Sequence, residues 1–248
     1  MKRKVIALAM VLALAGTVFL TGCGGGGSTV DSSKVAFAAR YELPVSTWDP
    51  AVCSDTSNQV LLNIYETLLR YEPATNTFKK VLATDYSSNA DGTVWTFKLR
   101  EGVKFHDGTD FNAEAVKYSI ERTIAGEMGT SYIWGPVKEI NVVDDYTVEF
   151  VLNQPIAFDY IVSCANAAYI YSPTAVEAAG STFEDQTNWF SEGNECGTGP
   201  YVLDSQTPGD QVVVAKYEEY WGGWEGDHLD KVIFKLISED ASRRQMLE

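Results

Sequence analysis

The sequence predicts a mixed α/β fold, and three observations support that prediction. Short segments that alternate apolar and polar residues, such as 94–99, are typical of half-buried strands. Between them lie segments in which apolar residues recur at helical spacing, such as 113–124. Apolar residues make up 45% of the 248 residues, which is enough for a sizeable core in one large domain or two smaller ones.

The first 22 residues have the composition of an export signal. Residues 2–4 are basic, and the apolar run 5–20 that follows is short for a membrane span. The run ends in Leu-Thr-Gly-Cys at 20–23, which resembles the lipobox of bacterial lipoproteins. This resemblance implies that residues 1–22 are removed and that Cys23 becomes a lipid-modified N-terminus. An ordinary secretory signal followed by a chance cysteine is the alternative.

The segment 23–34 is rich in glycine and serine, which predicts a flexible tether. If Cys23 carries a diacylglyceryl group, two acyl chains hold this tether at the membrane, because a single chain gives only marginal binding. The expected location is therefore the extracytoplasmic face of the cell membrane, in the periplasm or on the outer surface.

The exported part is strongly acidic. The formal charge of the whole sequence is −15, and removal of the three basic residues of the signal makes the side-chain charge −18. Such a surface repels the phosphates of nucleic acids, so no nucleic-acid partner is expected. The acidity mildly favours cationic or zwitterionic ligands.

The exported part is expected to begin with a strand at 34–43, which Pro44 ends. In 61–71, leucines and a tyrosine recur at helical spacing and predict a helix with one apolar face. Residues 93–100 predict a strand that enters a hairpin, with 103–105 as the return strand.

The segment 101–122 gathers one histidine and several acidic residues in a short window, which raises the question of a metal or acid–base site. His106 to Gly108 predicts a turn, since Asp-Gly tolerates left-handed backbone geometry. Asn112 is a plausible N-cap, and Glu114 lies in the first turn of the following helix, near the positive end of its dipole. These local roles, and the lack of a known metal-ligand spacing, favour scaffold over metal binding or catalysis.

The same patterns continue to the end of the chain. The helix after Asn112 is expected to bury the stripe Val116, Ile120 and Ile124. Two strands are predicted in 137–155, joined at Asp144-Asp145, and a short helix is predicted after Pro173. Another strand is predicted to start within 197–203, two more are predicted over 211–217 and 230–237, and a last helix is predicted in 238–248. This last helix has no stop signal, so we expect a chain that is the N-terminal part of a longer protein.

Three cysteines remain besides Cys23, namely Cys53, Cys164 and Cys196. An exported location permits a disulfide, and an odd number leaves one thiol over. A bridge between Cys164 and Cys196 is marginally favoured, with buried free thiols as the alternative.

The most informative stretch is DGTVWTFKLREGVKFHDGTDFNAEAVKYSIER at 91–122. It closely resembles the extracytoplasmic solute-binding proteins, family 5, of oligopeptide and dipeptide ABC importers. Shorter stretches match the family in the same order: WDP at 48–50, YETLLRYEP at 65–73, GTGPYVL at 197–203, YWGG at 220–223 and DKVIFKLI at 230–237. The chain departs from the family where Trp48 replaces a usual leucine and where an Asn-Pro before YWGG is missing.

The resemblance implies a type II periplasmic-binding-protein fold, in which two α/β lobes hinge around a buried ligand. By this resemblance, 35–72 and 173–248 belong to the first lobe, and 73–172 form an inserted second subdomain. Most of the C-terminal lobe would follow Glu248. The segment 91–122 is scaffold in the family.

The implied function is that of a substrate-binding lipoprotein of an ABC transporter, which captures peptides or a related small solute and delivers them to a permease. The ATPase subunits would be separate chains, and no cofactor, metal or catalytic residue is expected. The candidate ligand-binding residues are Ser46, Thr47, Trp48 and Asp49. Trp48 would offer an apolar or stacking surface and Asp49 a partner for a ligand amine. Core packing and a turn cap before Pro50 are the alternatives.

Two other functions stay open at this point. A secreted hydrolase needs a nucleophile and a base, but the sequence has no G-x-S-x-G or H-E-x-x-H motif, and its only histidines are His106 and His228. A surface peptide sensor would use the same fold without transport. Gly197, Thr198 and Gly199 are expected to permit a crossover between lobes rather than to contact the ligand.

Overall fold

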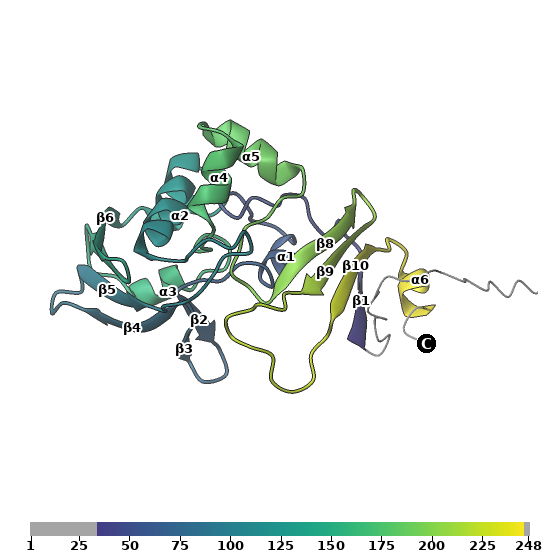
Figure 1. The fold of residues 1–248 in the computed structure, drawn as a ribbon, viewed down its shortest axis with the longest axis horizontal. Coiled ribbons are helices and arrows are strands. Elements are labelled where there is room, and N and C mark those ends of the chain that lie inside the picture. Colours follow the sequence, from purple (N-terminus) through teal and green to yellow (C-terminus); the bar gives the residue numbers. More distant parts are fainter. Residues whose placement is uncertain (1–33, 246–248) are drawn as a thin grey trace, which may run out of the picture. The chain divides into compact units, whose positions relative to one another are not determined.

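The computed structural model describes residues 34–245, and Figure 1 shows their course. The predicted signal peptide 1–22, Cys23 and nearly all of the predicted tether 23–34 lie outside the described residues. None of the helices in the described part combines the length and the apolar character that a membrane crossing requires.

The described residues form both strands and helices, as predicted for an α/β protein. The strands are β1 (Val35–Arg40), β2 (Leu69–Glu72), β3 (Thr77–Lys80), β4 (Ala83–Ser88), β5 (Val94–Leu99), β6 (Val137–Asp144), β7 (Thr147–Leu152), β8 (Tyr201–Thr207), β9 (Gln211–Lys216) and β10 (Lys231–Leu236). The helices are α1 (Asn58–Leu61), α2 (Ala113–Gly126), α3 (Phe158–Val162), α4 (Pro173–Ala179), α5 (Phe183–Ser191) and α6 (Asp240–Gln245), with a 3₁₀ turn η2 (Ser131–Trp134).

One four-stranded sheet, here called the terminal sheet, joins the beginning of the described chain to its end. Its strand order is β1-β10-β9-β8 (Figure 1). β1 pairs in parallel with β10, from Val35 opposite Lys231 to Arg40 opposite Leu236. The other pairs are antiparallel hairpin neighbours. The terminal sheet packs against α1, α4 and α5 through a core that contains Leu61, Tyr171, Phe190 and Val214.

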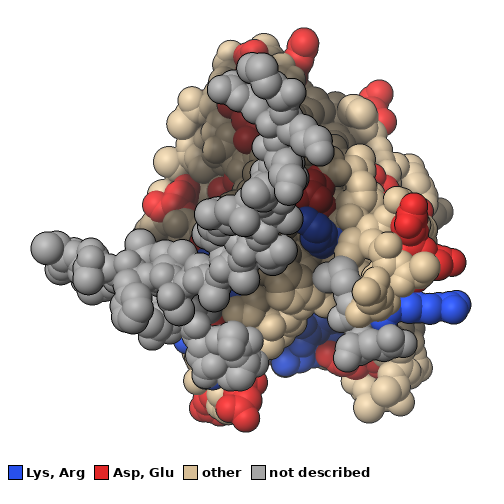
Figure 2. All heavy atoms as spheres, turned by 90° about the vertical axis from the view of Figure 1, so that its right-hand side faces the viewer, with Lys and Arg blue, Asp and Glu red and all other residues tan. Residues whose placement is uncertain are grey.

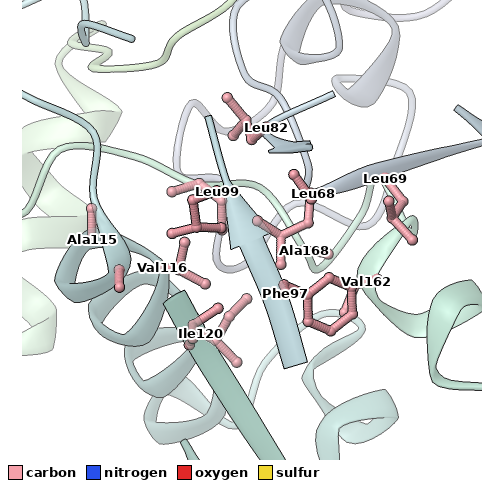
Figure 3. Close-up of a cluster of buried hydrophobic side chains, with 14 of the residues drawn as sticks. Leu68, Leu69, Leu82, Phe97, Leu99, Ala115, Val116, Ile120, Val162 and Ala168 are labelled. Atoms are coloured by element: carbon pink, nitrogen blue, oxygen red, sulfur yellow. The ribbon is translucent and has the colours of Figure 1, made fainter. Parts of the chain in front are cut away.

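A second four-stranded sheet, here called the hairpin sheet, has the order β4-β5-β7-β6 and is antiparallel throughout. Its core gathers β5 and α2: Phe97 and Leu99 lie in one cluster with Val116 and Ile120 (Figure 3). All four side chains are at most 4% exposed. Because a fully buried side chain of this kind contributes about 1.5–3 kcal/mol, the contact fixes α2 on the sheet.

The predicted helix over 61–71 is wrong. α1 ends at Leu61, and the last residues of the segment, from Leu69 on, belong to β2, which pairs with β3. The helix stops because its later carbonyls find other partners: the amide of Asn63 caps the carbonyl groups of Gln59 and Val60, and the carbonyl of Ile64 accepts from the N–H of Gly199 at 2.8 Å. The spacing of the leucines fits both arrangements.

The predicted return strand 103–105 is also wrong. β5 pairs with β4 on one side and β7 on the other, so both of its edges are occupied. The segment closes on itself instead: the N–H of Phe105 donates to the carbonyl of Thr109 at 2.9 Å, and that of Phe111 to the carbonyl of Val103 at 3.0 Å.

The predicted turn and N-cap in this region are confirmed. Gly108 has φ +83°, and Asn112 Oδ1 accepts from the N–H of Ala115 at 3.0 Å. The stripe on α2 is only partly as predicted, because Ile124 is 37% exposed. Each step of four residues advances about 40° around a helix, so Ile124 is rotated by about 80° from Val116 and leaves the buried face.

The predicted disulfide is absent. Cys53, Cys164 and Cys196 are free thiols, of which Cys53 and Cys196 are buried and Cys164 is half-buried. The Cys196 thiol lies 3.9 Å from the carbonyl oxygen of Ser172. The alternative of free thiols is therefore what the structure shows.

Candidate functional site

The four predicted ligand-binding residues lie in the segment 46–57, which connects β1 to α1. This segment is folded on itself by short polar contacts. The Ser46 hydroxyl donates to Asp55, and the N–H of Ser46 donates to Ser57 Oγ at 2.8 Å. Desolvation raises the pKa of Asp55, but the hydrogen bonds from Ser46 and Ser57 outweigh it and hold the pKa below its ordinary value. The Asp55 carboxylate is thus a stable acceptor for the turn.

Trp48 packs in the terminal-sheet core and is 3% exposed. Its Nε1–H donates to Gln206 Oε1 of β8 at 2.9 Å, which satisfies the one polar atom of the ring. The indole therefore ties the segment 46–57 to the terminal sheet.

Asp49 is fully buried and forms a bidentate ion pair with Arg122 of α2 (Nη1–Oδ1 2.9 Å and Nη2–Oδ2 2.8 Å). Asp49 Oδ2 also accepts from Thr187 of α5 at 2.9 Å, and Oδ1 accepts from the N–H of Ala51. Burial lowers the pKa of Arg122, but the bond to Asp49 outweighs it and raises the pKa above its ordinary value. A ligand amine at Asp49 would have to displace Arg122.

Thr47 completes the segment, because its hydroxyl accepts from the N–H of Asp49 at 3.2 Å. The structure thus brings Ser46 to Asp49 together as one braced turn between β1, α2, α5 and β8. Direct ligand contact by these residues stays a prediction.

A second polar cluster, which was not among the candidate residues, surrounds the carboxylate of Glu66. Oε2 accepts from Thr198 at 2.9 Å and from Trp221 Nε1–H at 2.7 Å, and Oε1 accepts from the Tyr220 hydroxyl at 2.8 Å. Burial raises the pKa of Glu66, and these three hydrogen bonds oppose that rise only in part. Glu66 lies in the YETLLRYEP stretch and its donors in the GTGPYVL and YWGG stretches, so the co-occurrence of these motifs is the signal that could have pointed to it.

The glycines beside Thr198 explain how this cluster can close. A Cβ on Gly197 would lie 2.0 Å from the carbonyl oxygen of Ile64, and a Cβ on Gly199 would lie 2.6 Å from that of Asn63. Only glycine permits the backbone to approach this closely.

A cavity of about 190 Å³ lies beside Glu66. Its lining includes Leu62, Tyr65, Glu66, Arg70, Ala165 and Tyr169. The two tyrosine rings are 5.6 Å apart and tilted by 41°. The Tyr169 hydroxyl donates to Asn58 Oδ1, which connects the cavity wall to the end of the segment 46–57.

His106 is buried and held on both ring nitrogens. Nδ1 lies 2.7 Å from Glu195 Oε2, and Nε2 lies 2.9 Å from the carbonyl oxygen of Gly199. Since neither nitrogen is free, His106 is not placed to act as a base. His228 lies in another loop, with its ring 4.9 Å from that of Trp224. Within residues 34–245, no group of three or more His, Cys, Asp and Glu side chains is arranged to hold a metal ion.

Figure 2 shows the face beyond β1 and α6. Acidic side chains stand at several separate places on the visible part of that face, and basic side chains lie among them.

Comparison with known proteins identifies one family of bacterial solute-binding proteins. Residues 77–248 match the family described as bacterial extracellular solute-binding proteins, family 5 Middle. The glutathione-binding protein GsiB of Shigella flexneri is 31% identical over 229 residues, which cover 89% of this chain and 43% of that protein. The chain thus spans about 43% of the length of the curated relatives it matches.

Solved structures show the same fold. The periplasmic binding protein DppA from Helicobacter pylori, in complex with the peptide STSA, is 27% identical, with a TM-score of 0.74 over 86% of this chain and 44% of that one. A nickel ABC transporter protein from Bacillus halodurans is 30% identical, with a TM-score of 0.68 over 86% of this chain and 41% of that one. The predicted type II periplasmic-binding-protein fold is therefore confirmed.

Proposed function

This chain belongs to family 5 of the bacterial extracellular solute-binding proteins, and on that premise we propose that it captures a small solute outside the cytoplasm and delivers it to an ABC permease. The observation that carries the proposal is the family match over residues 77–248, which spans the hairpin sheet and three strands of the terminal sheet. The ATPase subunits that drive transport are separate chains in this proposal.

A peptide is the proposed solute. The similarity to DppA, whose structure contains a peptide, supports this choice. An extended peptide can be held through main-chain hydrogen bonds, as an added strand is, so that many side chains are tolerated. Lobe closure would replace water by protein contacts and produce the form that a permease recognises.

The lobes are proposed at the boundaries that the sequence predicts. The hairpin sheet lies within 73–172, the proposed second subdomain, and the terminal sheet draws its strands from 35–72 and 173–248, the proposed first lobe. The segment 46–57 is braced by elements of both parts, since Asp49 pairs with α2 and Trp48 with β8. We propose that Ser46 to Asp49 form one wall of the cleft.

The experiment begins with the gene read through and past the codon for Glu248, and uses the complete product. The exported protein is dialysed against defined pools of di- to pentapeptides, and the retained compounds are identified by mass spectrometry. We expect saturable retention of peptide without turnover. Retention of another solute only would overturn the peptide assignment, and retention of nothing would overturn capture.

The same preparation separates the two competing functions. Hydrolysis of the peptides during dialysis would favour a secreted hydrolase. Co-purification with permease subunits is expected for an importer component, whereas peptide binding without such subunits would favour a sensor.

Attachment to the membrane through Cys23 is part of the proposal and has its own test. In cells fed labelled palmitate, the wild-type protein is expected to take up label, and Cys23→Ser is expected to take up none. The matched control is Cys164→Ser, which leaves the lipobox intact and should be labelled like the wild type. Equal labelling of all three proteins would overturn lipidation at Cys23.

A further inference from the structure

The cavity beside Glu66 has the size of a small organic group. Its volume is about 190 Å³, and an apolar cavity of about 150 Å³ holds benzene. Leu62 at 49% exposure and the exposed Arg70 stand at its open side, while Tyr65 and Tyr169 are 1% and 2% exposed. A short alkyl chain of four or five carbons therefore fits in the cavity beside the two rings.

The wall of this cavity includes Glu66, whose buried carboxylate can carry a negative charge. Among the described residues, Glu66 forms no ion pair, and the three groups that donate to it are neutral. A carboxylate has about four lone-pair sites, so one site on Oε1 has no donor. An anion buried without a paired cation is costly, and a ligand cation would relieve that cost.

The aromatic walls favour the same kind of ligand. Tyr65 and Tyr169 line the cavity side by side, and tyrosine rings attract ammonium groups through their π faces. Two arginines of this region are engaged elsewhere. The guanidinium of Arg100 lies 4.5 Å from the centre of the Trp221 ring, and Arg70 pairs with Glu72 at 3.3 Å.

From the buried carboxylate, the two rings and the volume, we propose that this cavity is a binding site for a short alkylammonium group, which approaches Glu66 with its charge and packs its chain against the rings of Tyr65 and Tyr169. The inference rests on the proposed function, because it names the chemical class of solute that the protein retains. It assigns the amine to Glu66 rather than to Asp49, whose carboxylate Arg122 already occupies.

The test uses the full chain and three probes of equal size and different charge: n-butylammonium, butan-1-ol and butyrate. Binding is measured by titration calorimetry and by the shift in melting temperature. We expect n-butylammonium to bind at least tenfold more tightly than butan-1-ol, and butyrate to bind least. Equal or tighter binding of butan-1-ol or butyrate would overturn the proposal, and so would a wild-type chain that binds none of the three.

Three variants locate the binding. Glu66→Gln removes the charge and keeps the shape, and is expected to weaken n-butylammonium binding at least tenfold. Ala165→Leu fills the cavity without touching the Glu66 cluster, and is expected to abolish binding even if Glu66→Gln fails to fold. Glu101→Gln is the matched control, because it removes an exposed carboxylate that does not line the cavity. Wild-type affinity in Ala165→Leu would overturn the site.

The outcomes also separate this inference from the proposed function. If the complete protein retains peptides in dialysis while n-butylammonium does not bind, the cavity assignment fails and the proposed function stands. If n-butylammonium binds at the cavity while no solute is retained in dialysis, the cavity assignment stands and solute capture fails.

Discussion

At the scale of single residues, buried charges hold the loops of this protein in place. Asp49 and Arg122 connect the segment 46–57 to α2, and His106 and Glu195 connect the turn after β5 to the strand entry before β8. Neither pair was predictable from local sequence, because the partners lie 73 and 89 positions apart. Asp49, His106 and Arg122 stood inside recognisable motifs and Glu195 did not, and the pattern does not say which charge meets which.

Arg122→Met is expected to destabilise the protein strongly. The substitution leaves the Asp49 carboxylate buried and unpaired, and loss of one partner of a buried pair costs about 3–5 kcal/mol. The free energy of unfolding is measured by urea titration. Arg70→Gln is the control, because the exposed Arg70–Glu72 pair contributes less than about 1 kcal/mol. A similar small loss in both variants would contradict the assignment of Asp49 to Arg122.

The His106–Glu195 pair is expected to make stability depend on pH. Burial lowers the pKa of His106, but the hydrogen bond and charge of Glu195 outweigh it, so the pKa is raised. The Gly199 carbonyl and Glu66 add to the rise. Because the pKa is higher in the folded state than its unfolded value of about 6.5, the pair stabilises fully below about pH 6.5 and loses this contribution as the pH rises through the raised value.

The measurement is the free energy of unfolding from pH 6 to pH 9 for the wild type and for His106→Gln. The wild type should lose more stability over this range than His106→Gln, in which the titrating group is gone. His228→Gln serves as the control and should follow the wild type. Parallel curves for the wild type and His106→Gln would show that this pair does not govern the dependence.

At the scale of helices and strands, the sequence correctly predicted those features that depend on contacts between neighbouring residues. The turn at Gly108, the N-cap at Asn112 and the strand pair around Asp144-Asp145 follow from neighbours in sequence, and all three are present. The helix predicted over 61–71 was wrong because the conformation of this segment depends on the distant N–H of Gly199 and on pairing with β3. The Glu66 cluster escaped notice for the same reason, since it joins three separate motifs.

Asn112→Ala is expected to cost about 0.5–2 kcal/mol, because it removes the acceptor for the N–H of Ala115 at the start of α2. Asn112→Asp keeps an acceptor at the same place and adds a favourable charge at the helix N-terminus, so it should retain or exceed wild-type stability. Chemical denaturation of both variants checks this. Equal losses in the two variants would show that the cap does not stabilise α2.

At the scale of the whole molecule, the two sheets differ in how far apart their strands lie in sequence. The hairpin sheet is built within Ala83–Leu152, whereas the terminal sheet pairs Val35–Arg40 with Lys231–Leu236. The sequence indicated a strand at or near each of these positions except β4 (Ala83–Ser88), and the parallel pairing of β1 with β10 was not predicted. Patterns along a chain do not encode which distant strands meet.

This difference predicts an order of folding. Non-local contacts form slowly because a long loop must first be closed. In a refolding experiment with pulsed hydrogen exchange, amides of β5 and β7 are expected to gain protection before amides of β1 and β10. The β8–β9 hairpin is the internal control, because it belongs to the terminal sheet but is local in sequence. Simultaneous protection of β1 and β5 would contradict the expected order.

The parallel pairing of β1 with β10 has a consequence for synthesis. Until the nascent chain has been made as far as Leu236, β10 is incomplete and β1 lacks its parallel partner. The backbone N–H and C=O groups along that edge of β1 then remain unpaired. The bond from Trp48 to Gln206 must wait as well, since Gln206 lies 158 positions later in the chain. The braced turn that follows β1 is therefore completed only when residues made much later have joined it.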